Sequence, residues 1–226
     1  MLASMKDAGI SKSVCMPISP NVAFENLKEP CRDNPTLVPF TSVDFTNSHD
    51  FNTAFDNDVL NGANGMKLHP VIQKVSFEDG KTLNVLEAFS IHKLPVLFHC
   101  GAQWNRSQDK KYAEYALPEN AIKMVEAFPK INFIIGHAGV YQVKQVMSIF
   151  KKFKNTYVDT SFQPAAIIKQ LIRVFGPERV LFASDWPFGS RKTNIETVEA
   201  ACQAIKDQSI NSLIFYENAE RLLTPC

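Results

Sequence analysis

The chain has 226 residues, of which 45% are hydrophobic and 21% charged, so it can bury one sizeable core and is not disordered as a whole. Its 24 Lys and Arg residues nearly balance 23 Asp and Glu residues. The resulting formal net charge of +1 provides no electrostatic footprint for nucleic acid or anionic lipid.

The five cysteines are scattered without a CxxC pair, which is typical of reduced thiols in a cytosolic protein. The opening segment MLASMKDAGISK is amphipathic and does not resemble a secretory signal. No apolar stretch approaches the roughly 20 residues that a membrane-spanning helix needs. We therefore expect a cytoplasmic protein with no nucleic-acid or membrane partner.

The hydrophobic pattern predicts a helix over 2–8 and then seven strands, each rich in Val, Ile, Phe and Leu and bounded by Gly, Pro, Asn or Asp. Successive strands begin 23 to 37 residues apart, which leaves room for one helix and two loops between them. Apolar residues on both faces favour parallel strands covered by helices. The predicted strands are 13–18, 36–44, 64–70, 94–101, 131–139, 156–161 and 179–187.

Three of the segments between strands have a clear helical period. Residues 118–128 begin with a proline near the start of an apolar stripe. Residues 164–175 carry a similar stripe, and Gly176-Pro177 predicts their end. A third helix is predicted over 193–206, opening at Thr193 or Asn194 with Glu196 as part of the cap.

Seven consecutive β/α units are consistent with two folds, because a (β/α)8 barrel needs eight units and an open doubly wound sheet needs five or six. The chain reaches a helix before its first strand, so a barrel would lack strand one. Without that strand, the flanking second and eighth strands would each expose an unpaired edge. No linker or composition shift divides the sequence, and we expect a single domain over residues 1–226.

Polar residues fall at the carboxyl ends of the predicted strands, where parallel α/β folds place their active sites. A single histidine in such a position is more often a hydrogen-bonded structural residue than a ligand. Here several strands repeat the feature, and two imidazoles with one carboxylate suit Zn²⁺ or a similar divalent ion. The strand-end residues are Lys67, His69, His99, His137, Asp159 and Asp185.

Four of these strings also carry a family resemblance. GMKLHPVIQ, LPVLFHCG, FIIGHAG and FASDWPFG resemble, in order, the strand-four, strand-five, strand-six and strand-eight motifs of the amidohydrolase superfamily. They are most similar to its amidohydrolase-related branch (family 2), which includes the aminocarboxymuconate-semialdehyde decarboxylase group. The closing FYENAERLL resembles the final helix of that family.

The resemblance implies a TIM-like (β/α) barrel with a divalent metal, Zn²⁺ as first choice, held by His99, His137 and Asp185. Asp185 matches a general base acting on metal-bound water, whose pKa falls to about 7 on coordination. His137 matches a residue that is a second ligand in binuclear members and orients the substrate in mononuclear ones. Lys67, His69 and Trp186 are the candidate substrate-binding residues at the mouth, with Trp186 as a wall of the pocket.

The sequence departs from the family pattern because it contains no HxH, the motif that supplies two metal ligands at the end of strand one. A truncated chain, a natural short form and a degenerate homologue without chemistry are three competing explanations. With the remaining ligands alone, we expect weak metal affinity and little activity.

The function that we predict from the resemblance is metal-dependent hydrolysis of a small organic substrate by activated water. One alternative is non-oxidative decarboxylation of a small carboxylic acid on the same metal. Another is a catalytically degenerate barrel that serves as a binding module. A homodimer is compatible with each of them.

Overall fold

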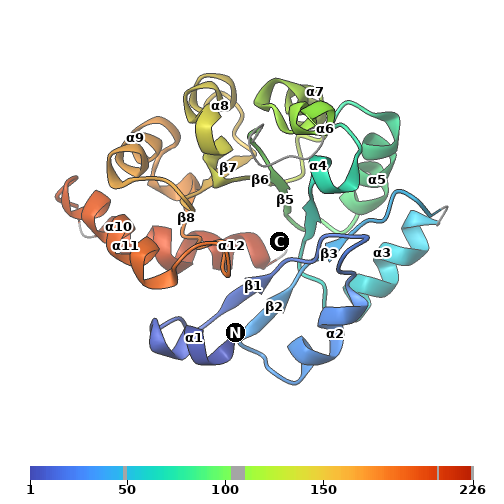
Figure 1. Ribbon diagram of the computed structural model, residues 1–226, viewed down its shortest axis with the longest axis horizontal. Helices are drawn as coiled ribbons and strands as arrows, with labels where there is room; N and C mark the ends of the chain where they lie inside the picture. Colours follow the sequence, from blue (N-terminus) through green and yellow to red (C-terminus); the bar gives the residue numbers. More distant parts are fainter. Residues whose placement is uncertain (48–49, 103–109, 208, 225–226) are drawn as a thin grey trace.

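Parallel strands curve into an arc surrounded by helices in the computed structural model, which describes residues 1–47, 50–102, 110–207 and 209–224 (Figure 1). All strand pairs are parallel; one ladder has the order β1-β2 and the other β3-β4-β5-β6-β7-β8. The strands are β1 (Ser13–Cys15), β2 (Leu37–Pro39), β3 (Thr41–Ser42), β4 (Met66–Leu68), β5 (Val96–His99), β6 (Phe133–Gly136), β7 (Thr156–Asp159) and β8 (Val180–Leu181).

The predicted strand 36–44 links the two ladders. Its first half, β2, pairs with β1, and the amide of Phe40 donates to the carbonyl of Cys15 at 2.9 Å. Its second half, β3, pairs with β4, and the amide of Thr41 donates to the carbonyl of Gly65 at 2.8 Å. One extended segment therefore changes neighbours at Phe40, and the two ladders continue one another around the arc.

Helices follow the strands around the outside of the arc, and none in the described ranges is long and apolar enough to cross a membrane. The α-helices are α1 (Leu2–Asp7), α2 (Glu25–Arg32), α3 (Phe51–Leu60), α4 (Pro70–Gln73), α5 (Gly80–Ser90), α6 (Lys110–Ala113), α7 (Ile122–Ala127), α8 (Val143–Phe150), α9 (Ala165–Phe175), α10 (Arg191–Gln203), α11 (Ser209–Ser212) and α12 (Asn218–Leu223). Tighter 3₁₀ turns occupy Glu114–Ala116, Pro118–Ala121, His137–Gln142 and Pro177–Arg179, and a π turn, Leu213–Glu217, precedes α12.

Two of the three predicted helices have different starts in the structure. The predicted helix 118–128 begins as the 3₁₀ turn Pro118–Ala121 and becomes α7 only afterwards. The predicted start at Thr193 or Asn194 was wrong, because Ser190 caps α10 by accepting a hydrogen bond from the amide of Thr193 at 3.3 Å. The end of α9 at Gly176 agrees with the prediction.

Alternation along the strands separates two layers of buried side chains. One set faces the surrounding helices, as Phe98 of β5 and Phe133 of β6 do within the main core. The opposite set faces the inside of the arc, where Leu97, Ile134 and Leu181 pack with Phe40 and with Leu222 of α12. The final helix thus contributes to the interior of the arc, and it lies between β8 and β1 in Figure 1.

The edge of β8 is covered, contrary to the expectation that it would be exposed. The amide of Phe182, just after β8, donates to the carbonyl of Ile214 at 2.9 Å. The buried side-chain amide of Asn218 donates to the carbonyls of Pro177 and Val180 at 2.8 and 2.9 Å. These bonds from the C-terminal helical segment satisfy groups that an edge strand otherwise leaves open. Among the described strands, β1 pairs only with β2.

Candidate active site

The predicted strand-end residues meet at one end of the parallel arc. Lys67 lies in β4, His99 ends β5 and Asp159 ends β7. His69 and His137 follow β4 and β6 directly, and Asp185 lies four residues beyond β8. The strands are therefore shorter than predicted, and three of the six side chains stand in the turns that follow them. Carboxyl ends of parallel strands share one face, so the arrangement forms a polar mouth.

Three histidine rings of this mouth lie in direct succession. The rings of His69 and His99 are stacked with centroids 4.0 Å apart and planes inclined by 6°. The ring of His137 stands edge-on to His99 at 5.2 Å. Burial lowers the pKa of His69 and of His99 well below the usual 6.5, and the nearby cationic forms of Lys67 and His137 lower both further. Both rings consequently resist protonation, and a neutral imidazole nitrogen can accept a hydrogen bond or bind a metal cation.

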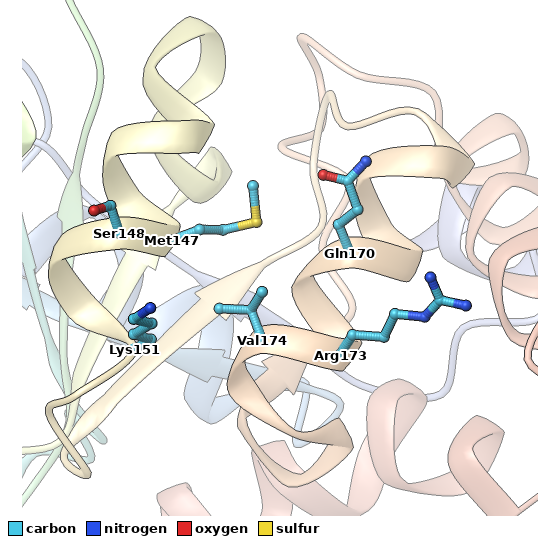
Figure 2. Close-up of a pocket in the computed structure, with 6 residues that line it drawn as sticks. All are labelled: Met147, Ser148, Lys151, Gln170, Arg173 and Val174. Carbon is cyan, nitrogen blue, oxygen red and sulfur yellow. The ribbon is translucent and has the colours of Figure 1, made fainter.

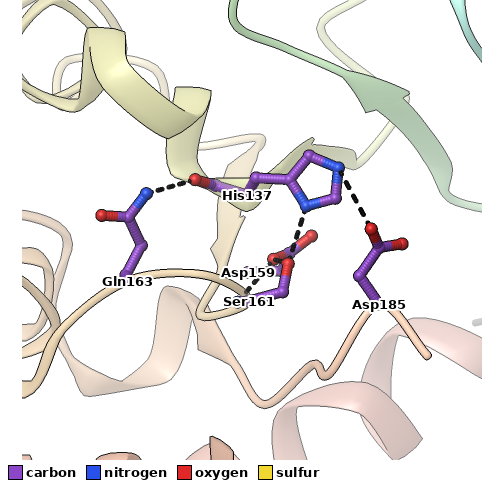
Figure 3. Close-up of polar contacts among 5 residues, drawn as sticks. All are labelled: His137, Asp159, Ser161, Gln163 and Asp185. Carbon is purple, nitrogen blue, oxygen red and sulfur yellow. Dashed lines mark hydrogen bonds and ion pairs between the residues drawn. The ribbon is translucent and has the colours of Figure 1, made fainter. Parts of the chain in front are cut away.

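His137 is held by a chain of buried polar side chains (Figure 3). Its Nδ1 lies 2.7 Å from Ser161 Oγ, and Ser161 Oγ donates to Asp159 Oδ1 at 2.5 Å. The other ring nitrogen, Nε2, faces Asp185 Oδ2 at 4.0 Å. Burial lowers the pKa of His137, and Asp159 and Asp185 oppose that effect.

The backbone around His137 adopts a strained turn. His137, Ala138 and Val140 have positive φ angles of 58°, 45° and 49°, a region that residues with a Cβ rarely occupy. The side-chain amide of Gln163 donates to the carbonyls of His137 at 2.6 Å and Val140 at 3.2 Å. Gln163 thus ties the turn to the segment after β7, and such strain often marks functional sites.

Lys67 provides a buried positive charge in the mouth. Its side chain is 6% exposed and forms no hydrogen bond or ion pair within 4.0 Å among the described residues. Burial lowers its pKa to about 8, while the carboxylates of Asp185 and Asp159 act in the opposite direction. Lys67 therefore remains mostly cationic at pH 7 but gives up its proton more readily than an exposed lysine.

Two residues predicted to bind substrate have other described contacts. His69 caps α4, and its Nδ1 accepts a hydrogen bond from the amide of Ile72 at 3.4 Å. The indole of Trp186 lies under the guanidinium of Arg191, 4.5 Å from ring centroid to Cζ, and remains 40% exposed. These contacts account for both side chains structurally, and their role toward a substrate stays a prediction.

The donors at the mouth suit a divalent metal chemically but do not complete its coordination. The described residues contain no group of three or more His, Cys, Asp or Glu side chains placed to hold a metal ion. His137 Nε2 and Asp185 Oδ2 are 4.0 Å apart, whereas two tetrahedral ligands, each about 2.1 Å from Zn²⁺, lie about 3.4 Å apart. The three predicted ligands are thus brought to one mouth without a complete metal site.

Two surface hollows are lined without the histidines of the mouth, although Trp186, next to Asp185, lines the second. A groove of about 330 Å³ between α8 and α9 is lined by Met147, Ser148, Lys151, Gln170, Arg173 and Val174 (Figure 2). A second hollow, of about 340 Å³, lies between α1 and the loop that leads into α10. Neither contains any of the histidines of the mouth, so we assign the candidate site to the strand ends.

A parallel barrel with basic and acidic side chains at its carboxyl-terminal mouth is the architecture of a large class of enzymes. The amidohydrolase family model Amidohydro_2 matches residues 3–224, and the chain therefore belongs to that family. This confirms the family that the sequence resemblance predicted. No curated protein shows significant sequence similarity to the chain.

Solved structures confirm the TIM-barrel fold. An uncharacterized TIM-barrel protein from Bordetella bronchiseptica is 19% identical with a TM-score of 0.78, covering 99% of this chain and 81% of that one. A 5-carboxyvanillate decarboxylase from Novosphingobium aromaticivorans, solved with manganese and 4-hydroxy-3-methoxy-5-nitrobenzoic acid, is 15% identical with a TM-score of 0.77, covering 98% and 78%. A probable 2-pyrone-4,6-dicarboxylic acid hydrolase from Acinetobacter baumannii, with citric acid bound, is 14% identical with a TM-score of 0.66, covering 98% and 86%.

Two residues that hydrogen-bond to His137 were not predicted from the sequence. Ser161 and Gln163 follow β7 in the string VDTSFQ, two and four residues after Asp159. The signal available was the Asp-x-Ser spacing at a strand end, since Asp commonly bonds the backbone two residues on. Nothing in the sequence indicates that the serine hydroxyl also reaches a histidine from a different strand.

Proposed function

We propose that the protein is an enzyme that acts on a small carboxylic acid, with non-oxidative decarboxylation as its reaction. The observation that carries this proposal is the buried ammonium of Lys67, which forms no ion pair within 4.0 Å among the described residues and whose charge Asp185 and Asp159 offset only in part. A buried charge is costly unless an opposite charge accompanies it, and an anionic substrate supplies one. The decarboxylase among the structural relatives, solved with an aromatic acid, supports the same substrate class.

Decarboxylation needs a positive charge and a transferable proton near the carbon that bears the carboxylate. The C–C bond to the carboxylate breaks, CO₂ leaves, and the electron pair stays on the substrate, where that carbon takes up a proton. An ammonium fixed at this point stabilises the developing negative charge. A proton donor with a pKa of about 8 is also well matched to neutral pH. We assign both roles to Lys67 and place His137 and Asp185 beside the substrate.

The proposed reaction does not depend on a bound divalent metal, and metal binding is measured as a separate test. The manganese-containing decarboxylase suggests Mn²⁺ rather than the Zn²⁺ expected from the resemblance. The described side chains do not complete a metal site, and no step above depends on one. We expect weak Mn²⁺ binding, with a Kd in the millimolar rather than the nanomolar range, measured by calorimetry on metal-stripped protein.

The second candidate function is hydrolysis of a small carboxylic acid, in which Asp185 acts as general base toward water. It rests on the pairing of Asp185 with His137 and on the hydrolase among the structural relatives. The third is ligand binding without turnover, which an incomplete metal site also suits. Release of CO₂ separates the first candidate from the other two.

The test uses purified protein with 5-carboxyvanillate or 2-pyrone-4,6-dicarboxylate, each with and without added Mn²⁺. We expect CO₂ release from 5-carboxyvanillate and a loss of about 10²-fold or more in Lys67→Met. Exposed Lys130→Met is the matched control and should retain wild-type rates. Hydrolysis of the pyrone without CO₂ would establish the second candidate. Ligand binding by calorimetry without either product would establish the third, and no binding at all would refute the substrate class.

A further inference from the structure

We infer that Asp159 and Ser161 are positioning residues that fix the tautomer of His137, placing its proton on Nδ1 and leaving Nε2 unprotonated toward Asp185. Asp159 ends β7 and Ser161 follows two residues later, and both lie on the Nδ1 side of the ring, whereas Asp185 faces Nε2 (Figure 3). His137, Asp159 and Ser161 are 6%, 4% and 0% exposed, so water does not compete for their hydrogen bonds. The inference builds on the site of the proposed function but is independent of which reaction occurs there.

The tautomer follows from counting donors and acceptors. Asp159 Oδ1 accepts from the amide of Ser161 at 2.9 Å and from Ser161 Oγ at 2.5 Å. A carboxylate only accepts, and a hydroxyl has one proton to donate. That proton is committed to Asp159, so Ser161 Oγ can only accept at its 2.7 Å contact with His137 Nδ1. The proton in that contact therefore belongs to His137 Nδ1.

This tautomer determines which groups can bind on the Nε2 side of the ring. With Nδ1 protonated, the Nε2 lone pair faces the Asp185 carboxylate across 4.0 Å, and two acceptors do not attract one another. A donor atom of a bound substrate, such as a hydroxyl or an acid proton, can sit about 2.8 Å from both. The Asp159–Ser161 pair thus keeps this position open. With the opposite tautomer, Nε2–H would turn toward Asp185 and close it.

The test reads the tautomer directly by ¹⁵N NMR of histidine-labelled protein without substrate at pH 7.5. A His137→Gln spectrum assigns the ring signals. We expect more than nine-tenths Nδ1–H in the wild type. In Ser161→Ala the acceptor for Nδ1–H is lost, and we expect the Nε2–H form to become the major one. Asp159→Ala frees the serine proton for Nδ1 and should shift the tautomer in the same direction.

The chain contains a matched control at its surface. Ser209 donates to Asp207 Oδ1 through its amide at 3.0 Å and its hydroxyl at 2.6 Å, which repeats the Asp-x-Ser geometry without a histidine. Ser209→Ala should leave the His137 signals unchanged. Asp159→Asn keeps a side-chain carbonyl acceptor and should restore the wild-type tautomer that Asp159→Ala loses.

Two results would overturn the inference: an Nε2–H tautomer in the wild type, or an unchanged tautomer in a folded Ser161→Ala variant. Where turnover is measurable, Ser161→Ala should lower kcat by about 10- to 100-fold with little change in KM. Failure of the proposed reaction would leave the NMR result standing, because the spectra need no substrate. The two proposals can therefore fail separately.

Discussion

At the scale of single residues, Lys67 combines a cost to stability with a possible use in binding. Its ammonium is buried in the mouth, and the pKa of about 8 reflects the unfavourable transfer of that charge from water. Asp159 and Asp185 compensate only in part. Residues that reduce stability in this way are often kept for function, since binding sites commonly carry charges that the empty protein does not satisfy.

We predict that Lys67→Met raises the free energy of unfolding at pH 7 by about 1–3 kcal/mol, since one pKa unit corresponds to about 1.4 kcal/mol. Because the pKa falls from 10.5 in the unfolded chain to about 8, the folded state releases its proton first as pH rises. Wild-type stability should therefore rise relative to Lys67→Met between pH 8 and 10.5. Urea unfolding at several pH values measures this. A pH-independent difference would show that the lysine charge is not responsible.

The strand ends show how far the sequence predicts single functional residues. His99, His137 and Asp185 were predicted together because polar residues ending apolar strands share a face in parallel folds. The sequence could not predict that His137 and Asp185 stand in turns with positive φ angles, of 58° and 50°. Nor could it predict the distances between them, which depend on how the strands pack.

At the scale of elements, α12 supplies some of the hydrogen bonds and apolar contacts that a neighbouring strand would otherwise make with β8. Asn218 donates to the carbonyl of Val180, the first residue of that strand, and to the carbonyl of Pro177 in the turn before it, while Leu222 packs into the interior of the arc. The helix was predicted from the resemblance of FYENAERLL, but its effect on the strand edge was not. Sequence patterns give the apolar face of a helix without the partner that this face meets.

We predict that Asn218→Ala lowers the free energy of unfolding by about 2–3 kcal/mol, because the buried carbonyl of Val180 and the partly buried carbonyl of Pro177 lose their donor. The exposed ion pair between Lys12 and Glu220, which also joins α12 to the segment before β1, provides a contrast at 3.5 Å. Glu220→Ala should change stability by less than about 1 kcal/mol. Thermal and urea unfolding measure both variants. Equal effects would contradict the role given to Asn218.

At the scale of the whole molecule, the spacing of the strands predicted a parallel α/β fold, and the family resemblance narrowed it to the TIM-like barrel that the solved structures confirm. The seven predicted strands all occur, with 36–44 divided between two neighbours at Phe40. That division is a property of the packing, since the string TLVPFTSVD predicts an extended segment without indicating which neighbour each half pairs with. The sequence also could not separate the buried side chains into cores, since this depends on which helices cover which strands.

The N-terminal elements have a small core of their own, in which Met5, Cys15, Cys31 and Leu37 are buried. Cys100 and Cys202 lie in the main core, so each of the two cores holds two buried free thiols among the residues that the structure describes. We predict that, in low urea, Cys15 and Cys31 react with a thiol reagent at least about 10-fold faster than Cys100 and Cys202, because a small core opens locally at lower free energy. Mass spectrometry of labelled peptides measures this, with fully unfolded protein as the reference. Equal rates at all four would indicate a single opening event.

Independent opening of the small N-terminal core, as predicted above, would also affect the mouth. The side chains from Lys67 to Asp185 stand on β4 to β8 and their turns, outside the small N-terminal core. Local opening of the core around Met5, Cys15, Cys31 and Leu37 would then widen one side of the barrel, while the strand-end side chains keep their places on β4 to β8.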